Sequence, residues 1–423
     1  MSGNFKNIIY ERLIVLITNI LYALLILKTL NEEAISIYGY AAAVVSVISF
    51  LNVPFENIFF IREYDNTHFS NLINLTLIKY LMIFSVGILT YMLVGEEIIL
   101  LFGILIYTLR LAGEGLSNLF IILFSKQNKH NIVKSIRVKA SILKVLLLIF
   151  LLRSPELLTL LYIEMFFYLS LNFALVWTFN NQFYFKYQLL FNFKPLINEL
   201  KNYSVWTHLN GVISNYIYKS DPIFLKNVSG LSNISSYVIP LSLANYANLL
   251  PMYSSYNFTL LLGKFKGHTT TNYYINTSLG LNYILFAFTL VAYIVFSPIV
   301  LKFLIQTELF DPYIYLFLIT LGVLIIRAGG GAYYSIINSR NLVKDYTKMV
   351  ILPMLIISTI LYGISAYLYQ FYGVASANVI NSLIWVYLTY TFIKNKHPYN
   401  NYKLIFKLIL AKRYIVNEFI NRS

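Results

Sequence analysis

The residues of this sequence that could do chemistry are charged residues inside long apolar segments. A charge at the centre of a bilayer costs about 2.5 to 3.5 kcal/mol on insertion scales, so such residues usually face a protein interior or a wet cavity. The cations slightly outnumber the anions: Lys79, Arg110, Lys144, Lys219 and Arg327 against Glu56, Glu114, Glu164 and Asp221. An excess of positive charge inside a membrane predicts a binding site for an anion such as a phosphate.

Arg110 and Glu114 lie four residues apart in a predicted helix over 98–124, so they share one helix face. One interpretation is an internal ion pair that neutralises both groups during insertion. If the pair also lines a cavity, a substrate anion would compete with Glu114 for Arg110, and the pair would act as a gate.

Two further cations, Lys79 and Lys144, have a functional and a structural interpretation. Each either binds the anion or is neutralised near a helix end or beside an acidic residue, Glu56 or Glu164. With Glu114 and Asp221, we assign Glu164 to gating or ion pairing.

The predicted helix over 203–226 is the least apolar of the membrane-spanning segments. Its polar stripe recurs at a spacing of three to four residues: His208, Gly211, Asn215 and Lys219. Lipid would not tolerate this stripe, which must therefore face protein or water. Asp221 precedes Pro222, whose missing N–H predicts a break near this end of the helix.

Arg327 is followed by three glycines, Gly329 to Gly331. The next loop is about 10 residues or 15 Å of helix away, too far for comfortable snorkelling. The glycines indicate close helix packing or a kink, or else backbone N–H groups exposed to an anion. Arg327 and Lys219, with Arg110 behind them, are the predicted anion-binding residues, together with Asn215 and His208.

The composition predicts an all-α integral membrane protein, because 58% of the 423 residues are hydrophobic and only 12% are charged. Segments of about 20 apolar residues or more cross a bilayer. We predict about twelve such helices, near 13–30, 38–60, 73–94, 98–124, 132–152, 155–179, 203–226, 234–262, 276–300, 312–337, 347–371 and 373–393.

The predicted helices divide into two lobes of six. An N-terminal lobe over 1–179 and a C-terminal lobe over 203–393 are joined by a cytoplasmic loop over 180–202, and a basic tail covers 394–423. A weak echo between the lobes, Ser36–Tyr38 before Pro54 and Ser235–Tyr237 before Pro251, favours two pseudo-symmetric bundles around a central cavity. Within the tail, 402–420 is predicted to form an amphipathic helix on the membrane surface that transport can dispense with.

The basic residues gather in alternate loops, which predicts that both termini are cytoplasmic in a multi-pass inner-membrane protein. The net charge of +15 follows from that pattern, so no nucleic acid partner is expected. The five histidines lack metal-ligand spacing, and no phosphate-binding loop or serine nucleophile elbow occurs. We therefore expect no cofactor, no metal and no enzymatic activity.

The sequence resembles the Wzx-type polysaccharide flippases of the multidrug/oligosaccharidyl-lipid/polysaccharide (MOP) exporter superfamily over nearly its whole length. The resemblance rests on the twelve-helix layout, on NEEAISIYGYAAAV before the second helix, and on YKSDPIFLKNVSGLSNISSYVIPLSL in the second half. The latter is similar to the family pattern at Lys219, Asp221, Gly230 and Tyr237.

The resemblance implies a MATE-like transporter that flips an undecaprenyl-pyrophosphate-linked oligosaccharide to the periplasmic leaflet by alternating access. Its cargo would be an O-antigen (lipopolysaccharide) or capsular repeat unit, and its partners membrane lipids, a polysaccharide polymerase and a chain-length regulator. The alternatives are a cation-coupled multidrug exporter of the same superfamily, which would carry an acidic residue where Asn19 stands, and a polysaccharide polymerase or ligase, which would have a large external loop.

Overall fold

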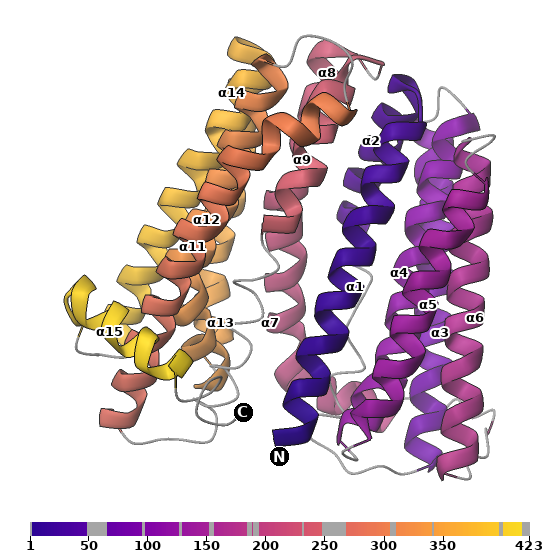
Figure 1. Ribbon diagram of the computed structural model, residues 1–423, viewed down its shortest axis with the longest axis horizontal. Helices are drawn as coiled ribbons and strands as arrows, with labels where there is room; N and C mark the ends of the chain where they lie inside the picture. The colour runs from indigo at the N-terminus through magenta and orange to yellow at the C-terminus, as the bar shows by residue number, and fades with distance from the viewer. Residues whose placement is uncertain are drawn as a thin grey trace. The chain divides into compact units, whose positions relative to one another are not determined.

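The computed structural model describes residues 2–48, 66–94, 98–126, 129–151, 156–183, 188, 194–230, 232–247, 268–304, 310–340, 342–396 and 401–416. The regular elements in these ranges are all helices (Figure 1). Helices are expected because a chain inside hydrocarbon must satisfy its backbone polar groups internally. The predictions for Pro54, Glu56 and Pro251, and for the ends of the second and eighth predicted helices, lie outside the described residues.

The chain divides into two compact units, residues 1–212 and 213–423. The first contains α1 (Ser2–Thr29), α2 (Glu32–Ile48), α3 (Asn66–Val94), α4 (Ile98–Lys126), α5 (His130–Leu151), α6 (Leu157–Phe183) and the first part of α7 (Lys194–Lys219). Within this unit α4 packs against α2, α3, α5 and α6, while α1 packs against α5.

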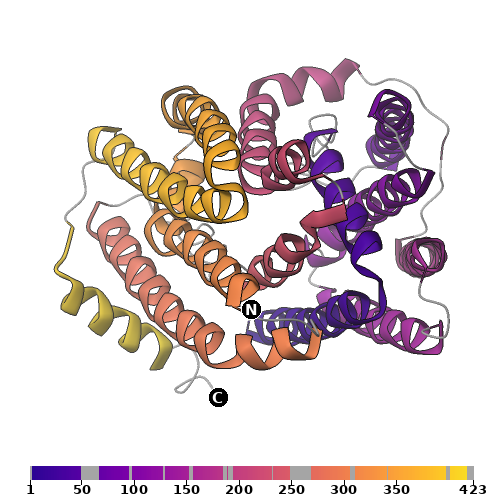
Figure 2. The ribbon, with the colours of Figure 1, turned by 90° about the horizontal axis from the view of Figure 1, so that it is seen from above.

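The second unit follows from the last turns of α7. It contains α8 (Asp221–Ser229), the 3-10 turn η3 (Ser232–Ile234), α9 (Ser235–Ala247), α11 (His268–Leu304), α12 (Phe310–Ser339), α13 (Val343–Tyr346), the π-helical η4 (Thr347–Ile351), α14 (Leu352–Lys396) and α15 (Leu404–Ile415). Figure 2 shows the neighbours α15, α11, α12 and α14 in that order across this unit, each packed against the next.

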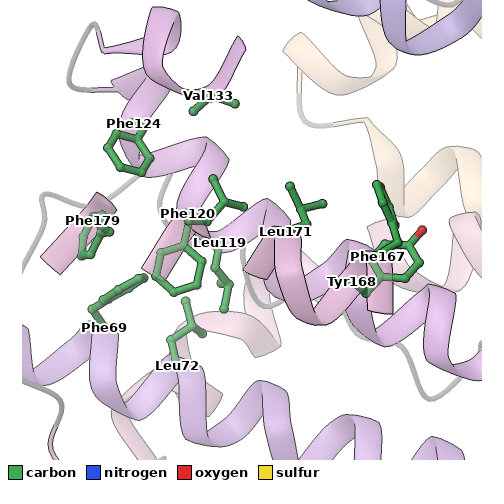
Figure 3. Close-up of a cluster of buried hydrophobic side chains, with 11 residues drawn as sticks. Phe69, Leu72, Leu119, Phe120, Phe124, Val133, Phe167, Tyr168, Leu171 and Phe179 are labelled. Carbon is green, nitrogen blue, oxygen red and sulfur yellow. The ribbon is translucent and has the colours of Figure 1, made fainter. Parts of the chain in front are cut away.

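Aromatic packing holds the first unit together. A cluster of buried side chains from α3, α4, α5 and α6 surrounds Phe120, which meets Phe69 edge-on with the ring centroids 5.5 Å apart (Figure 3). Phe179 of α6 lies 5.5 Å from Phe120 and 5.6 Å from Phe124, both on α4. These rings fix α6 on α4 and so position the charged residues that the two helices carry further along.

Three helix boundaries can be compared with the predictions. The predicted loop over 180–202 is partly helical, because α7 begins at Lys194 with Pro195 in its first turn, where proline is favoured. The predicted break before Pro222 is confirmed, since α7 ends at Lys219 and α8 begins at Asp221. The predicted boundary between the eleventh and twelfth helices is confirmed, because α14 consists of two helices that meet at a kink at Gln370, where φ is 48°.

Six of the helices in the described ranges are long and apolar enough to cross a membrane, the kinked α14 counting as one. They lie in 69–92, 100–121, 157–182, 270–304, 311–338 and 343–396, and a shorter apolar helix covers 14–29. The prediction of an all-α membrane protein is therefore confirmed. The four-part division into lobes, loop and tail stays a prediction.

Candidate functional site

Arg327 lies in the membrane-spanning part of α12 with its side chain half-buried. The guanidinium is close enough to the phenols of Tyr218 on α7 and Tyr334 on α12 to interact with them electrostatically. Among the residues that the structure describes, Arg327 has no carboxylate partner. A guanidinium keeps its charge throughout the physiological pH range. The described part of the chain therefore leaves this charge to water or to a bound anion.

Aromatic residues of four helices, α7, α12, α13 and α14, form a wall beside this arginine. Tyr218 stacks on Trp385 with the ring centroids 5.3 Å apart and an interplanar angle of 29°. The Trp385 indole N–H donates to the Tyr346 hydroxyl at 2.8 Å, and that hydroxyl shares a hydrogen bond with Thr389 at 3.0 Å. Tyr334 meets Tyr346 edge-on at 6.2 Å. Because these polar groups satisfy one another, the wall is held in one arrangement.

The glycines after Arg327 bring α12 close to α14. A Cβ on Gly329 would lie 2.5 Å from Val386 Cγ1, so only glycine allows this approach. At Gly330 the nearest atom to such a Cβ is 3.9 Å away. Close helix packing, one of the two interpretations of the glycines, is therefore confirmed at Gly329.

The polar side chains of the α7 stripe are exposed or half-buried among the described residues. Nothing lies within 4 Å of a Cβ built on Gly211, and the side chains of Asn215 and Lys219 are exposed. His208 is half-buried on the same stripe. Lys219 follows Tyr218 directly in the chain, which places its backbone next to the aromatic wall. The roles predicted for these residues stay predictions.

Asp221, at the start of α8, is fully buried in the second unit. One carboxylate oxygen accepts hydrogen bonds from the Tyr237 hydroxyl at 2.8 Å and from the Asn378 amide at 3.3 Å. Within the described ranges no cation pairs with Asp221. Gly230, with φ of 77°, ends α8 and returns the chain to α9, where Tyr237 lies.

Polar atoms without a described hydrogen-bond partner gather near Asp221. They include its own second oxygen Oδ1 and the Ser220 hydroxyl. Tyr362 of α14 interacts with both Asp221 and Asn381, so these groups are neighbours. Unpartnered groups at this depth are costly unless water or an ion completes them.

In the first unit the predicted ion pair between Arg110 and Glu114 is present. Arg110 Nε lies 3.3 Å from Glu114 Oε1, and the two side chains are 35% and 54% exposed. The Tyr168 hydroxyl of α6 also donates to Glu114, at 3.1 Å. This partly exposed pair fits both interpretations, an internal ion pair and a gate.

Lys144 of α5 is buried and pairs with Glu164 of α6, with 2.7 Å between the ammonium and a carboxylate oxygen. Its ammonium also lies over the rings of Tyr22 at 4.3 Å and Phe167 at 4.7 Å. The pairing interpretation of Lys144 is therefore confirmed. Lys79 is also buried, with its ammonium 4.5 Å from the centroid of the Tyr80 ring.

The residues of α14 that contribute to the second-unit site were not predicted from the sequence. Asn378 and Asn381 lie three residues apart in a predicted membrane helix, and that spacing of amides on one face was a usable signal. Trp385 continues the same face one turn later. Tyr218 and Tyr334 gave no such signal, because tyrosine is abundant in this chain, at 37 residues.

No protein-family model matches the sequence, and no curated protein sequence matches it. Solved structures do match. An outward-facing multidrug resistance MATE family transporter of the MOP superfamily has a TM-score of 0.63 and 14% identity, covering 93% of this chain and 95% of its own. The lipid II flippase MurJ, in an inward closed conformation, has a TM-score of 0.61 and 17% identity, covering 99% and 92%.

A third match is a MOP superfamily transporter from Pyrococcus furiosus whose binding pocket is described as having reverse polarity, suggesting a different function. Its TM-score is 0.55 and its identity 12%, covering 93% of this chain and 96% of its own. At these identities the likeness concerns the fold alone. The chain has the all-helical fold that MATE transporters and MurJ share within the MOP superfamily.

Proposed function

We propose that this protein flips an undecaprenyl-pyrophosphate-linked oligosaccharide, an O-antigen or capsular repeat unit, from the cytoplasmic to the periplasmic leaflet of a bacterial inner membrane. The observation that carries the proposal is Arg327, a half-buried guanidinium in a membrane helix with no carboxylate partner among the described residues. An anionic cargo would supply the missing negative charge.

A pyrophosphate suits the groups around Arg327. A guanidinium grips phosphate oxygens through two parallel N–H donors, and such charge-assisted contacts contribute about 1.5 to 3 kcal/mol each. The wall of Tyr218 and Trp385 offers flat apolar faces, on which the rings of sugars and the start of a lipid chain can rest. Lys219 adds a point charge at the exposed end of α7. Arg110, in the first unit, is already paired with Glu114.

The fold supports a transporter, because the similar structures are described as a multidrug resistance transporter and as a lipid II flippase. Transporters built from two repeated bundles commonly move their cargo by alternating access, in which one bundle rocks against the other around a fixed site. The sign of the charge at Arg327 favours the flippase over an exporter of cationic drugs. No feature of the Arg327 site favours the enzyme alternative, a polysaccharide polymerase or ligase.

The proposal is tested by complementation of a flippase-null strain, scored by surface polysaccharide, with membrane abundance checked by immunoblot. Arg327→Lys should retain part of the transport, since the charge remains but the bidentate grip is lost. Arg327→Ala should lose most of it, about 10- to 100-fold. The double variant Arg327→Asp, Lys219→Asp should abolish surface polysaccharide at normal abundance.

The matched control is Lys344→Asp with Lys348→Asp, which makes the same charge change at two exposed lysines near the start of α13 and in η4. It should transport normally. Normal surface polysaccharide from the Arg327→Asp, Lys219→Asp variant would contradict the proposal. Equal losses of surface polysaccharide in this variant and in the Lys344→Asp, Lys348→Asp control would also contradict it.

One observation favours a second candidate, a cation-coupled multidrug exporter. Asp221 is a fully buried carboxylate with one unpartnered oxygen, a group that a monovalent cation or a proton could neutralise. If export of cationic drugs is the activity, overexpression should raise drug resistance and Asp221→Asn should cancel that gain. Unchanged drug susceptibility together with restored surface polysaccharide would decide for the flippase.

A further inference from the structure

The helix α15 sits on a small seat on α11. A Cβ on Gly280 would overlap the backbone carbonyl of Lys407, so the two helix backbones are in direct contact there. One turn before Gly280, Asn276 accepts a hydrogen bond from the Tyr402 backbone N–H at 3.1 Å. One turn after it, Tyr283 lies under the Lys407 ammonium at 5.8 Å. Asn276, Gly280 and Tyr283 therefore form one continuous face of α11, which we call the α15 seat.

The face of α15 that meets the seat is buried. Ala411 and Lys407 are 0% and 6% exposed. Burial lowers the pKa of the Lys407 ammonium, as expected for a charge held away from water. This helix is therefore packed on α11 of the second unit rather than loosely attached to it.

The opposite face of α15 is apolar in its first two turns and basic in its last. Ile405, Phe406 and Ile409 are 70%, 59% and 42% exposed. Lys412 and Arg413 are exposed in the following turn. Lys412 and Arg413 give this face a positive charge, and residues 401–416 contain no aspartate or glutamate.

The composition of this face and the orientation of α15 favour the membrane surface as its binding partner. Figure 1 shows α15 running across α11 near the end where α11 begins. A helix that crosses a membrane-spanning helix there lies along the bilayer surface, where apolar side chains reach the acyl chains and basic ones meet phosphates. A second copy of the same face is disfavoured because it would bring like charges together.

We propose that the outer face of α15 binds anionic phospholipid headgroups, and that this binding holds α15 on its seat. The proposal is independent of the transported cargo. It assigns Lys412 and Arg413 to the headgroups and Ile405, Phe406 and Ile409 to the acyl region. Each basic residue near an anionic surface strengthens binding about fivefold, so loss of both should weaken it about 30-fold.

The chain has no cysteine, so a single introduced cysteine can be labelled selectively in the full-length protein. Ile409→Cys carries an environment-sensitive fluorophore, and Lys348→Cys, exposed in η4, serves as the control site. Each protein is placed in nanodiscs of phosphatidylcholine, with or without one quarter phosphatidylglycerol. Quenching by lipid-attached and by water-soluble nitroxides then reports where the label lies.

We expect the label at 409 to become lipid-accessible only with phosphatidylglycerol, and to lose that response when Lys412→Gln and Arg413→Gln are added. Phosphatidylglycerol should also raise the melting temperature of the unlabelled protein and of the control Lys344→Gln, Lys348→Gln, but not of Lys412→Gln, Arg413→Gln. Equal insertion in both lipid mixtures would overturn the proposal. So would quenching that depends on protein concentration, which would indicate a second copy, or a phosphatidylglycerol response unchanged by the Lys412, Arg413 variant.

Discussion

Among the described residues, two cations in the membrane helices of the first unit form ion pairs, whereas Arg327 and Asp221 of the second unit do not. The first unit pairs Arg110 with Glu114 and Lys144 with Glu164, at 3.3 and 2.7 Å. In the second unit, neither Arg327 nor Asp221 has an oppositely charged partner within the described ranges. Charges that a fold neutralises for itself hold helices together. Charges without a partner in the fold need a ligand, an ion or water to neutralise or solvate them, and such positions are candidates for function.

The largest expected effect breaks the buried pair of the first unit. Glu164→Gln leaves the Lys144 ammonium buried without a carboxylate, which should cost about 3 to 5 kcal/mol of unfolding free energy. The melting temperature of the purified protein should fall by more than about 6 °C. Glu114→Gln is the matched control, because that pair is partly exposed and should cost less than about 1 kcal/mol.

The double variant Lys144→Met, Glu164→Leu should recover most of the loss, because it removes both charges and keeps the volume. A similar fall for Glu114→Gln and Glu164→Gln would contradict the distinction between a buried and an exposed pair.

A smaller effect is expected at Asp221, where hydrogen bonds replace the ion pair. Tyr237→Phe removes the donor at 2.8 Å and should lower the unfolding free energy by about 1 to 3 kcal/mol. Asp221→Asn keeps an acceptor for Tyr237 while removing a buried charge, so its melting temperature should stay close to that of the wild type. Tyr369→Phe, at an exposed tyrosine, is the control. If Asp221→Asn destabilises the protein more than Tyr237→Phe does, the carboxylate is paired with a cation within the fold.

The smallest effect has the opposite sign. Arg327→Met removes a half-buried charge with no carboxylate partner among the described residues, so the unfolding free energy should rise by about 1 kcal/mol, or 2 to 4 °C in melting temperature. Transport should be lost in the same variant. A destabilisation comparable to that of Glu164→Gln would mean that Arg327 is paired within the fold, and the contrast between the units would disappear.

The helices could be predicted from the sequence because apolar length is a local property. The helix expected over 312–337 forms as Phe310–Ser339, within about two residues at each end. Partners on different helices could be predicted only as alternatives, because they depend on which helices become neighbours. Lys144 and Glu164 are 20 residues apart on two helices, and Asn378 reaches Asp221 across 157 residues. The Arg110 and Glu114 pair, within one helix, could be predicted from spacing alone.

The kink of α14 at Gln370 sets the length of the following helix arm, and so the bilayer thickness that this arm matches. The arm after the kink ends at Lys396 and spans roughly 39 Å at 1.5 Å per residue. Exposed Tyr367 and Tyr369 lie at the kink and Lys394 and Lys396 at the far end, residue types that favour the two membrane interfaces. This arm exceeds a hydrocarbon core of about 30 Å. The kink joins this arm to the preceding arm of α14. In a thinner bilayer we therefore expect the arm to tilt rather than to shift along the membrane normal.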